Sequence, residues 1–156
     1  MRTKTIGLVA HDNRKKDLVE WFNFNIETLI RHKFVCTGTT GTLLKKEVEK
    51  RFGSNFNFED KFTILKSGPL GGDQQLGSMI AEGKINILIF LWDPMEPMPH
   101  DVDVKALLRL ATLYNIPIAC NRSTADFIIS SPLFESDYKP IIKDYTSYLK
   151  RRVDLN

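Results

Sequence analysis

Apolar runs and amphipathic stretches alternate along the whole chain. The apolar runs have the length and composition of β-strands, and they lie at 5–10, 33–37, 62–67, 85–92 and 116–121. The run INILIFLW at 85–92 has almost no polar alternation, which is typical of a strand buried on both faces of a parallel sheet. Strands that alternate with helices predict an α/β fold, here an open, mostly parallel five-stranded sheet with helices on both faces.

The stretches between these runs carry apolar residues at helical spacing. In the helix expected at 103–115, Leu107, Leu110, Ala111 and Tyr114 follow the i, i+3, i+4, i+7 rule. Further helices are expected at 11–32, 38–52, 72–84, 123–131 and 144–152, the one at 38–52 being entered through a loop. The pair Ser123 and Asp126 resembles a capping box, so the helix at 123–131 is expected to begin with Ser123 as its cap.

Size and charge narrow the class of protein. The chain has 156 residues, which suits one domain spanning 1–156. The net charge of +3 is too small to argue for nucleic acid, but it does not oppose an anionic small molecule. The longest apolar run is well short of the roughly 20 residues of a membrane span, and the N-terminal run makes a poor signal peptide. We expect Cys36 and Cys120 to be buried thiols in a reducing cytoplasm, since their spacing does not suit a metal.

Polar stretches follow the ends of the predicted strands. They are HD at 11–12, TGTTG at 37–41, SGPLGGD at 67–73, WDP at 92–94 and NRST at 121–124. In an open parallel sheet, ligands bind beyond the carboxyl ends of the strands. We therefore expect these stretches to gather along one edge of the sheet.

Two of these stretches suit a phosphate group. TGTTG combines threonine hydroxyls with a helix N-terminus, which attracts anions, and SGP at 67–69 adds a second donor-rich turn. Lys15 is positioned to add positive charge. The alternatives are an ordinary capped turn for TGTTG and a solvated side chain for Lys15, which belongs to the run RKK.

Histidines and carboxylates share the same edge. A carboxylate that removes a carbon-bound proton and an imidazole that stabilises the resulting oxyanion would suit proton transfer next to a carbonyl. Asp73 follows two glycines and is expected to cap its helix, where a carboxylate is strongly ionised. A lone His or Asp at a strand end is more often a cap or a surface group. The sequence has no nucleophile elbow, metal cluster or dinucleotide-binding glycine motif.

In combination, the motifs resemble those of the methylglyoxal synthase family. The matching stretches, from about Gly7 to Arg152, are LVAHD, TGTTG, SGPLGGDQQLG, INILIFLWDP, PHDVDVKALLRLATLYNIPIACNRSTADFII and DYTSYLKRR. The resemblance implies a doubly wound α/β fold and a cytoplasmic carbon–oxygen lyase that converts dihydroxyacetone phosphate to methylglyoxal and inorganic phosphate. It also implies a homohexamer with no cofactor and no metal. Phosphate is expected to inhibit, because product and substrate would share one site.

The resemblance also assigns roles to residues. Asp73 would be the catalytic acid/base, and His100 would polarise the substrate carbonyl. The residues expected to hold the substrate, chiefly its phosphate, are His11, Lys15, Thr37, Gly38, Thr39, Thr40, Ser67, Gly68 and Arg152. Asp12, Asp93 and Asp103 match carboxylates near the family's site.

One stretch departs from the family, and one alternative function stays open. The segment at 45–62 is longer than the usual family connection, although motifs that match lie on both sides of it. Domains that resemble this fold also occur as non-catalytic regulatory modules that bind phosphate-bearing effectors. Such a module would have no need of Asp73, His100 and Asp103 together, so the acid/base set favours the enzyme.

Overall fold

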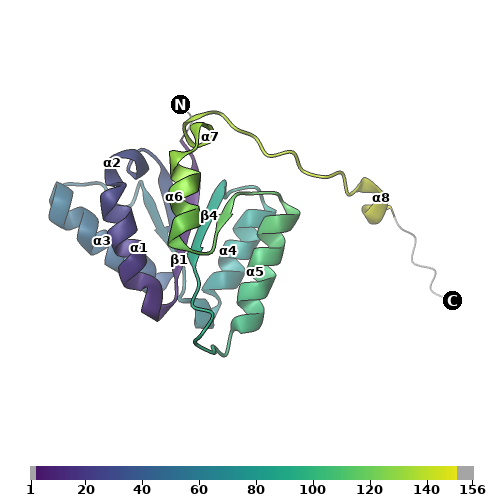
Figure 1. Ribbon diagram of the computed structural model, residues 1–156, viewed down its shortest axis with the longest axis horizontal. Coiled ribbons are helices and arrows are strands. Elements are labelled where there is room, and N and C mark those ends of the chain that lie inside the picture. The colour runs from purple at the N-terminus through teal and green to yellow at the C-terminus, as the bar shows by residue number, and fades with distance from the viewer. Residues whose placement is uncertain (1–2, 151–156) are drawn as a thin grey trace.

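Five parallel strands form one sheet in the computed structural model, which describes residues 3–150 (Figure 1). The strands are β1 (Thr5–Ala10), β2 (Lys33–Cys36), β3 (Phe62–Ile64), β4 (Ile87–Leu91) and β5 (Ile118–Ala119). Their order is β3-β2-β1-β4-β5, and every neighbouring pair is parallel. The chain therefore winds outward from β1 in one direction and then in the other, which confirms the doubly wound prediction.

Helices connect the strands and cover both faces of the sheet. The longer ones are α1 (Lys15–Phe24), α3 (Gly38–Phe52), α4 (Gly72–Ala81), α5 (Asp101–Leu113) and α6 (Arg122–Ser130). Short helices are α2 (Ile26–Leu29), α7 (Pro132–Glu135) and α8 (Thr146–Leu149), with 3-10 turns η1 (Asp12–Arg14) and η2 (Gly68–Leu70). Among residues 3–150, no helix is both long and apolar enough to span a membrane.

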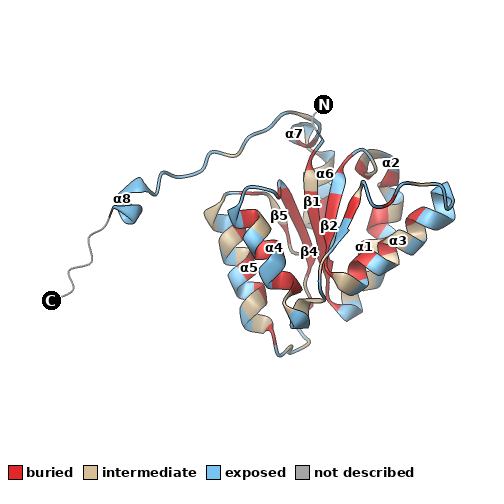
Figure 2. Cartoon of the chain, turned by 180° about the vertical axis from the view of Figure 1, so that it is seen from behind, coloured by how far each residue is buried: buried red, intermediate tan, exposed pale blue. Residues whose placement is uncertain are grey.

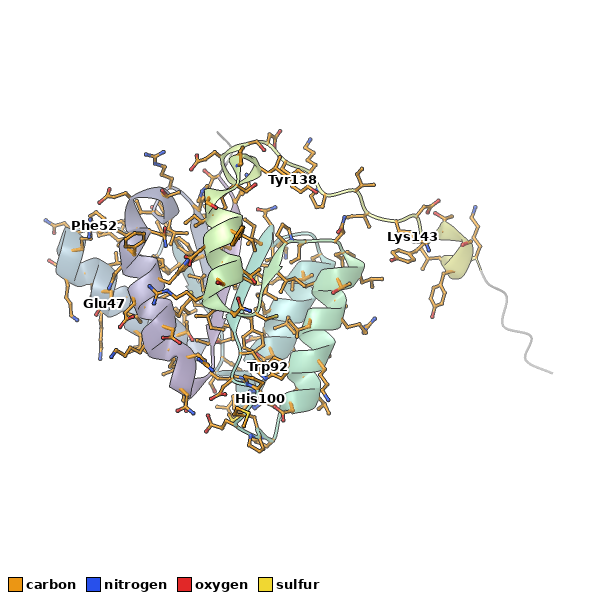
Figure 3. All side chains as sticks on the ribbon, viewed as in Figure 1. Glu47, Phe52, Trp92, His100, Tyr138 and Lys143 are labelled. Carbon is orange, nitrogen blue, oxygen red and sulfur yellow. The ribbon has the colours of Figure 1, made fainter. Side chains whose placement is uncertain are left out.

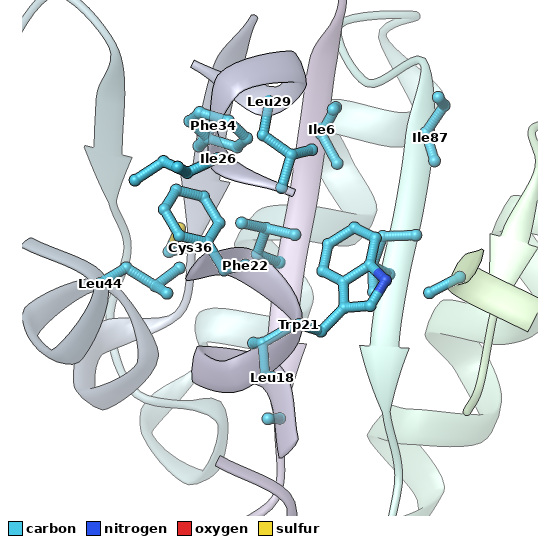
Figure 4. Close-up of a cluster of buried hydrophobic side chains, with 14 of the residues drawn as sticks. Ile6, Leu18, Trp21, Phe22, Ile26, Leu29, Phe34, Cys36, Leu44 and Ile87 are labelled. Carbon is cyan, nitrogen blue, oxygen red and sulfur yellow. The ribbon is translucent and has the colours of Figure 1, made fainter. Parts of the chain in front are cut away.

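Alternating side chains of the strands divide the core into two apolar layers. Ile6 and Leu8 of β1 face the cluster built with α1, α2, α3 and α6, whereas Val9 faces the cluster built with α4 and α5. Figure 4 shows Trp21 and Phe22 of α1 within the first cluster. Figure 2 shows that burial is concentrated on the sheet and on the helix sides that face it. This arrangement explains why β4 is apolar at all five of its positions.

Two helix boundaries differ from the sequence prediction. The helix expected at 11–32 is interrupted at Asn25, whose side-chain amide and backbone N–H both donate to the carbonyl of Trp21. The cap of α6 is Asn121, whose Oδ1 accepts from the N–H of Thr124, so Ser123 is not the cap. Asp126 instead accepts a hydrogen bond from the Trp21 indole and joins α6 to α1.

The segment at 45–62 contains the second half of α3, a loop at 53–61 and the first residue of β3. Phe58 in this loop is buried and stacks on Phe62 of β3, with a centroid distance of 4.1 Å. Because β3 begins at Phe62 and the strands are parallel, the loop lies at the amino-terminal edge of the sheet.

Residues 141–150 form an arm that extends away from the body (Figures 1 and 3). All ten residues are exposed, and they include the large apolar side chains Ile141, Tyr148 and Leu149. The carbonyl of Ile141 accepts from the Asn115 side chain at the root of this arm. Helix α8 covers 146–149 of the helix expected at 144–152, and residues 151–152 lie outside the described part of the chain.

Candidate active site

A cavity of about 180 Å³ opens at the carboxyl ends of the central strands. Ten of the predicted site residues line it, namely His11, Asp12, Lys15, Thr37, Thr39, Thr40, Ser67, Gly68, Asp73 and His100. They come from four strand-to-helix connections that are far apart in the sequence. The prediction that these stretches gather along one edge of the sheet is correct for the stretches after β1 to β4.

Three other predicted residues do not line the cavity, and a fourth is not described. Gly38 begins α3 and packs against the Lys66–Ser67 backbone, and Asp103 lies in the first turn of α5. The Asp93 carboxylate accepts hydrogen bonds from the Asn13 side chain and from the N–H of Met95. Arg152 lies outside the described residues.

Asp73 places a buried carboxylate in the cavity wall. Its side chain is 2% exposed, and neither carboxylate oxygen has a hydrogen-bond partner. The N-cap of α4 is Gly71, which adopts a left-handed conformation at φ 98°, and Asp73 is the second residue of the helix. The expectation that Asp73 caps its helix is therefore wrong, and its oxygens are free to face a ligand.

Burial raises the pKa of the Asp73 carboxyl above its usual value. The charge of nearby His100 opposes this rise in pKa, and the negative charge of Asp103 adds to it. A helix N-terminus favours the ionised form of a carboxylate, whereas the burial of Asp73 disfavours it. A carboxylate with a raised pKa is a stronger base when it is ionised.

His100 and His11 line the cavity together with this carboxylate. His100 Nε2 lies 3.8 Å from Asp73 Oδ2, too far for a hydrogen bond between them. The two imidazole rings meet edge to face, with their centroids 5.8 Å apart. Figure 3 shows His100 at the end of the molecule opposite Tyr138.

The surroundings of His11 define its tautomer. The backbone N–H of Asp93 donates to His11 Nδ1 at 3.3 Å, so Nδ1 is the acceptor and neutral His11 carries its proton on Nε2. Burial lowers the pKa of His11, which favours this neutral form. His11 Nε2 is buried and has no partner. His11 therefore presents an N–H donor at the cavity.

Two backbone loops form the other side of the cavity. Helix α3 begins at Gly38, so the N–H groups of Thr39 and Thr40, which lie in its first turn and have no intrahelical partner, are close to the hydroxyls of Thr37, Thr39 and Thr40. The Gly38 N–H donates to the Lys66 carbonyl at 3.1 Å and joins this loop to Ser67 and Gly68. A helix N-terminus with added hydroxyl donors suits an anion.

Lys15 is the cation of the cavity lining. Its side chain is 16% exposed, and its Nζ donates to the Ala10 carbonyl at 3.1 Å and to Asp12 Oδ1 at 2.5 Å. The pKa of Asp12 is lowered by this hydrogen bond and by the charge of Lys15. The alternative of a fully solvated Lys15 is therefore wrong.

Buried polar atoms without a partner concentrate in this cavity. Residues 3–150 contain six such side-chain atoms, and all except His32 Nε2 belong to residues that line the cavity. The five are His11 Nε2, Thr40 Oγ1, both Asp73 oxygens and His100 Nδ1. Proteins satisfy nearly all buried polar groups, so a cluster of unsatisfied ones indicates a ligand site.

Sequence reasoning missed five lining residues, namely Val9, Ala10, Pro69, Phe90 and Met98. Val9, Ala10 and Phe90 lie at strand ends that the edge argument already placed at the site, so their position was a usable signal. Met98 carried no such signal, because its place depends on how the loop at 92–100 folds. Within the described chain, no group of three or more His, Cys, Asp or Glu residues could hold a metal.

A larger cavity, of about 510 Å³, lies at the opposite edge of the sheet. Mainly apolar side chains line it, including Phe127, Ile128 and Tyr138, and none of the predicted site residues takes part. The chemistry of the predicted residues therefore belongs to the smaller cavity.

Comparison with known proteins gives the family. The family described as MGS-like domain matches residues 17–120. A methylglyoxal synthase from Oleidesulfovibrio alaskensis is 60% identical over 148 residues, which is 95% of this chain and 95% of that protein. The chain belongs to the methylglyoxal synthase family. A methylglyoxal synthase from Maridesulfovibrio salexigens is 55% identical over 156 residues, 97% of this chain and 99% of its own.

A solved methylglyoxal synthase also has the same fold. The crystal structure of methylglyoxal synthase from Elizabethkingia anophelis superposes with a TM-score of 0.84 at 50% identity, covering 99% of this chain and 95% of that one. The chain, including its segment at 45–62, therefore has the methylglyoxal synthase fold.

Proposed function

We propose that this protein converts dihydroxyacetone phosphate to methylglyoxal and inorganic phosphate, acting as a carbon–oxygen lyase on a phosphate ester without a cofactor. The observation that supports this most is the cluster of five unpartnered buried polar atoms in one small cavity. A carboxylate, two imidazoles and a phosphate-type cradle are the groups that the reaction needs. Membership of the methylglyoxal synthase family agrees with it.

The phosphate of the substrate would bind in the two loops. The first turn of α3 would donate backbone N–H groups and the hydroxyls of Thr37, Thr39 and Thr40, and Ser67 and Gly68 would close the other side. Lys15 would add a positive charge, and Asp12 would hold the Lys15 ammonium in place. Gly38 would keep the two loops in contact, since a side chain there would press on the Ser67 N–H. Arg152, which the family resemblance adds, would be a further phosphate contact.

Asp73 would remove the proton from the hydroxymethyl carbon of the substrate. The C–H electrons then form the carbon–carbon double bond of an enediolate, and the former carbonyl oxygen takes the negative charge. Burial raises the pKa of Asp73, which strengthens it as a base and stabilises the neutral acid formed by proton transfer. The neighbouring charge of Asp103 favours the same protonation.

The two histidines would stabilise the negative oxygen. His11 presents Nε2–H, because the Asp93 backbone N–H occupies its Nδ1. His100 lies beside Asp73 and would donate to the carbonyl oxygen as negative charge develops on it. A neutral donor stabilises an oxyanion without transferring its own proton.

Elimination would complete the reaction. The enediolate loses the proton of its terminal hydroxyl to the departing phosphate as that carbon becomes an aldehyde, and the C–O bond to phosphate breaks. The resulting enolate takes a proton on its terminal CH₂, which gives methylglyoxal, and Asp73 in its acid form would return that proton. The C–O bond breaks readily only when it is aligned with the enediolate π system, so the phosphate cradle would control the product.

The buried carboxylate favours an enzyme over a regulatory module. A module that only binds an anion gains nothing from a carboxylate with two unpaired oxygens beside it, since this carboxylate costs desolvation energy and repels the ligand. A base for proton abstraction requires such a group.

We also propose that the chain is one domain that assembles into a homo-oligomer, with the family's hexamer as the expected state, in the reducing cytoplasm. The arm at 141–150 supports assembly, because Ile141 and Leu149 expose 87% and 80% of their surface. A second copy would cover these side chains. Sedimentation equilibrium should give a hexamer for the full chain and a smaller species for the double variant Ile141→Ser/Leu149→Ser; equal masses would contradict this role of the arm.

Cys36 and Cys120 are both free thiols, which agrees with the proposed location in the reducing cytoplasm.

The decisive experiment incubates the purified protein with dihydroxyacetone phosphate and measures methylglyoxal and inorganic phosphate in the same sample. The proposal requires the two products in equal amounts and their loss in Asp73→Asn. Phosphate without methylglyoxal would indicate a phosphatase instead, and an aldose phosphate without free phosphate would indicate an isomerase.

A further inference from the structure

Gln75 connects the catalytic helix to the loop that leaves β3. Its side-chain Oε1 accepts a hydrogen bond from the N–H of Lys66 at 2.9 Å. The last sheet-type bond of this stretch is one residue earlier, from the Leu65 N–H to the Cys36 carbonyl. The Gln75 side chain therefore binds the first backbone N–H after the stretch whose N–H groups bond to the sheet.

The carbonyl of the same residue contacts the second phosphate loop. Lys66 O accepts from the N–H of Gly38, at the start of α3. The backbone of Lys66 thus joins three segments, which are the start of α3, the Ser67–Gly68 turn and the first turn of α4 that carries Asp73. These segments supply the cradle and the base of the proposed reaction.

The three segments are packed backbone to backbone. A Cβ atom on Gly72 would lie only 2.0 Å from Lys66 O, and the Gly72 N–H donates to the Ser67 carbonyl at 2.9 Å. Gly72 and Ser67 fix how close the two segments are. The Gln75 bond lies about one helical turn further along α4. A single contact would let the two segments rotate about it, so this second contact is needed to fix the angle between them.

We propose that Gln75 is a positioning residue that determines how the enediolate divides between elimination and reprotonation; this inference rests on the proposed function. Elimination breaks the C–O bond to phosphate and requires that bond to be aligned with the π system. Reprotonation returns the proton from Asp73 to carbon, re-forms a carbonyl and leaves the phosphate ester intact, so it requires no such alignment. A change in the angle between the cradle and the base therefore slows elimination more than reprotonation.

The test compares three variants in D₂O with dihydroxyacetone phosphate as substrate. Gln75→Met keeps the length of the side chain and removes the acceptor, Gln75→Glu keeps the acceptor, and Gln74→Met changes the exposed neighbouring glutamine as a control. The readout is the deuterium returned to carbon in unreacted substrate and in aldose phosphate, divided by the methylglyoxal formed. This ratio should rise about fivefold in Gln75→Met, the factor that corresponds to losing one hydrogen bond, and stay near the wild-type value in the other two.

Each outcome separates the inference from a general loss of structure. Because the Gln75 bond is a single bond exposed to solvent, the melting temperature of Gln75→Met should be no more than about 2–4 °C below that of Gln74→Met. A slower Gln75→Met enzyme with an unchanged deuterium ratio would overturn the inference, as would a Gln75→Glu ratio that equals that of Gln75→Met. If the wild-type protein forms no methylglyoxal, the proposed function itself fails.

Discussion

Replacing Gly68 with alanine would place one methyl group where the reacting carbons are proposed to bind. A Cβ atom at this position would lie 3.2 Å from Asp73 Oδ2, 3.2 Å from His100 Nε2 and 3.3 Å from Asp73 Oδ1. These distances are shorter than the roughly 3.5–4.0 Å of an optimal contact between carbon atoms. The methyl group would therefore fill the space between the base and the imidazole.

The size of the effect follows from the approach distance of the substrate. A carbon that gives up its proton must come within about 3–3.5 Å of the carboxylate oxygen, and a misplacement of about 1 Å costs roughly 100-fold in rate. A methyl group already at that distance excludes the substrate carbon, so kcat/KM should fall at least about 100-fold. Stability should change little, because Gly68 has no positive φ and the close contacts require the Asp73 and His100 side chains to shift by only a few tenths of an ångström.

A second glycine provides the matched control. Gly83 has φ +70°, and a Cβ atom added there would meet no other atom within 4 Å. Gly83→Ala should therefore cost about 1–2 kcal/mol of stability and leave kcat/KM unchanged. Initial rates of methylglyoxal formation and thermal unfolding of both variants test this contrast. A Gly68→Ala enzyme with kcat/KM near the wild-type value would show that the reacting carbons do not bind between Asp73 and His100.

Further predictions concern the base, the cradle and a buried histidine. Asp73→Asn should lower kcat at least about 100-fold, because the amide cannot accept the proton, yet leave phosphate binding intact by calorimetry. Thr39→Ala should weaken the binding of phosphate and of substrate equally, each by the roughly 0.5–3 kcal/mol of a lost hydrogen bond. The phosphate Ki and the substrate KM measure the two effects, and unequal changes would mean that phosphate and substrate bind at different sites. Burial lowers the pKa of His32 below its ordinary 6.5, and its Nδ1 accepts from the Lys4 N–H. The stability due to neutral His32 should therefore be complete above pH 6.5 and decrease as pH falls from there toward the pKa of His32 in the folded protein. In urea unfolding of His32→Gln, which keeps an acceptor, the free energy of unfolding should lack this decrease with falling pH.

The sequence allowed the fold to be predicted because its signals are local. The apolar run at 85–92 and the helical spacing at 103–115 contain the information for β4 and α5 within themselves. The edge argument then brought His11, Thr37 and Ser67 together, since parallel strands end on the same side.

What could not be predicted depends on tertiary packing. The missing cap at Asp73 results from Gly71 taking the N-cap position, and the raised pKa of Asp73 results from burial by segments distant in sequence. The capping box at Ser123 was wrong because Asn121 caps α6 and the Trp21 indole binds Asp126. Cys120 was expected to be buried, but it is only half-buried, at the end of the short strand β5.

The loop at 53–61 has a practical consequence for work with this enzyme. It lies before β3 at the amino-terminal edge of the sheet, whereas the candidate active site lies beyond the carboxyl ends. Residues 53–55 are exposed, and the loop is anchored to the body by Phe58 rather than by its tip. A fluorescent label or a surface linker attached at Ser54 would therefore sit away from the chemistry, and an immobilised enzyme held there would keep its substrate entrance open to the solution.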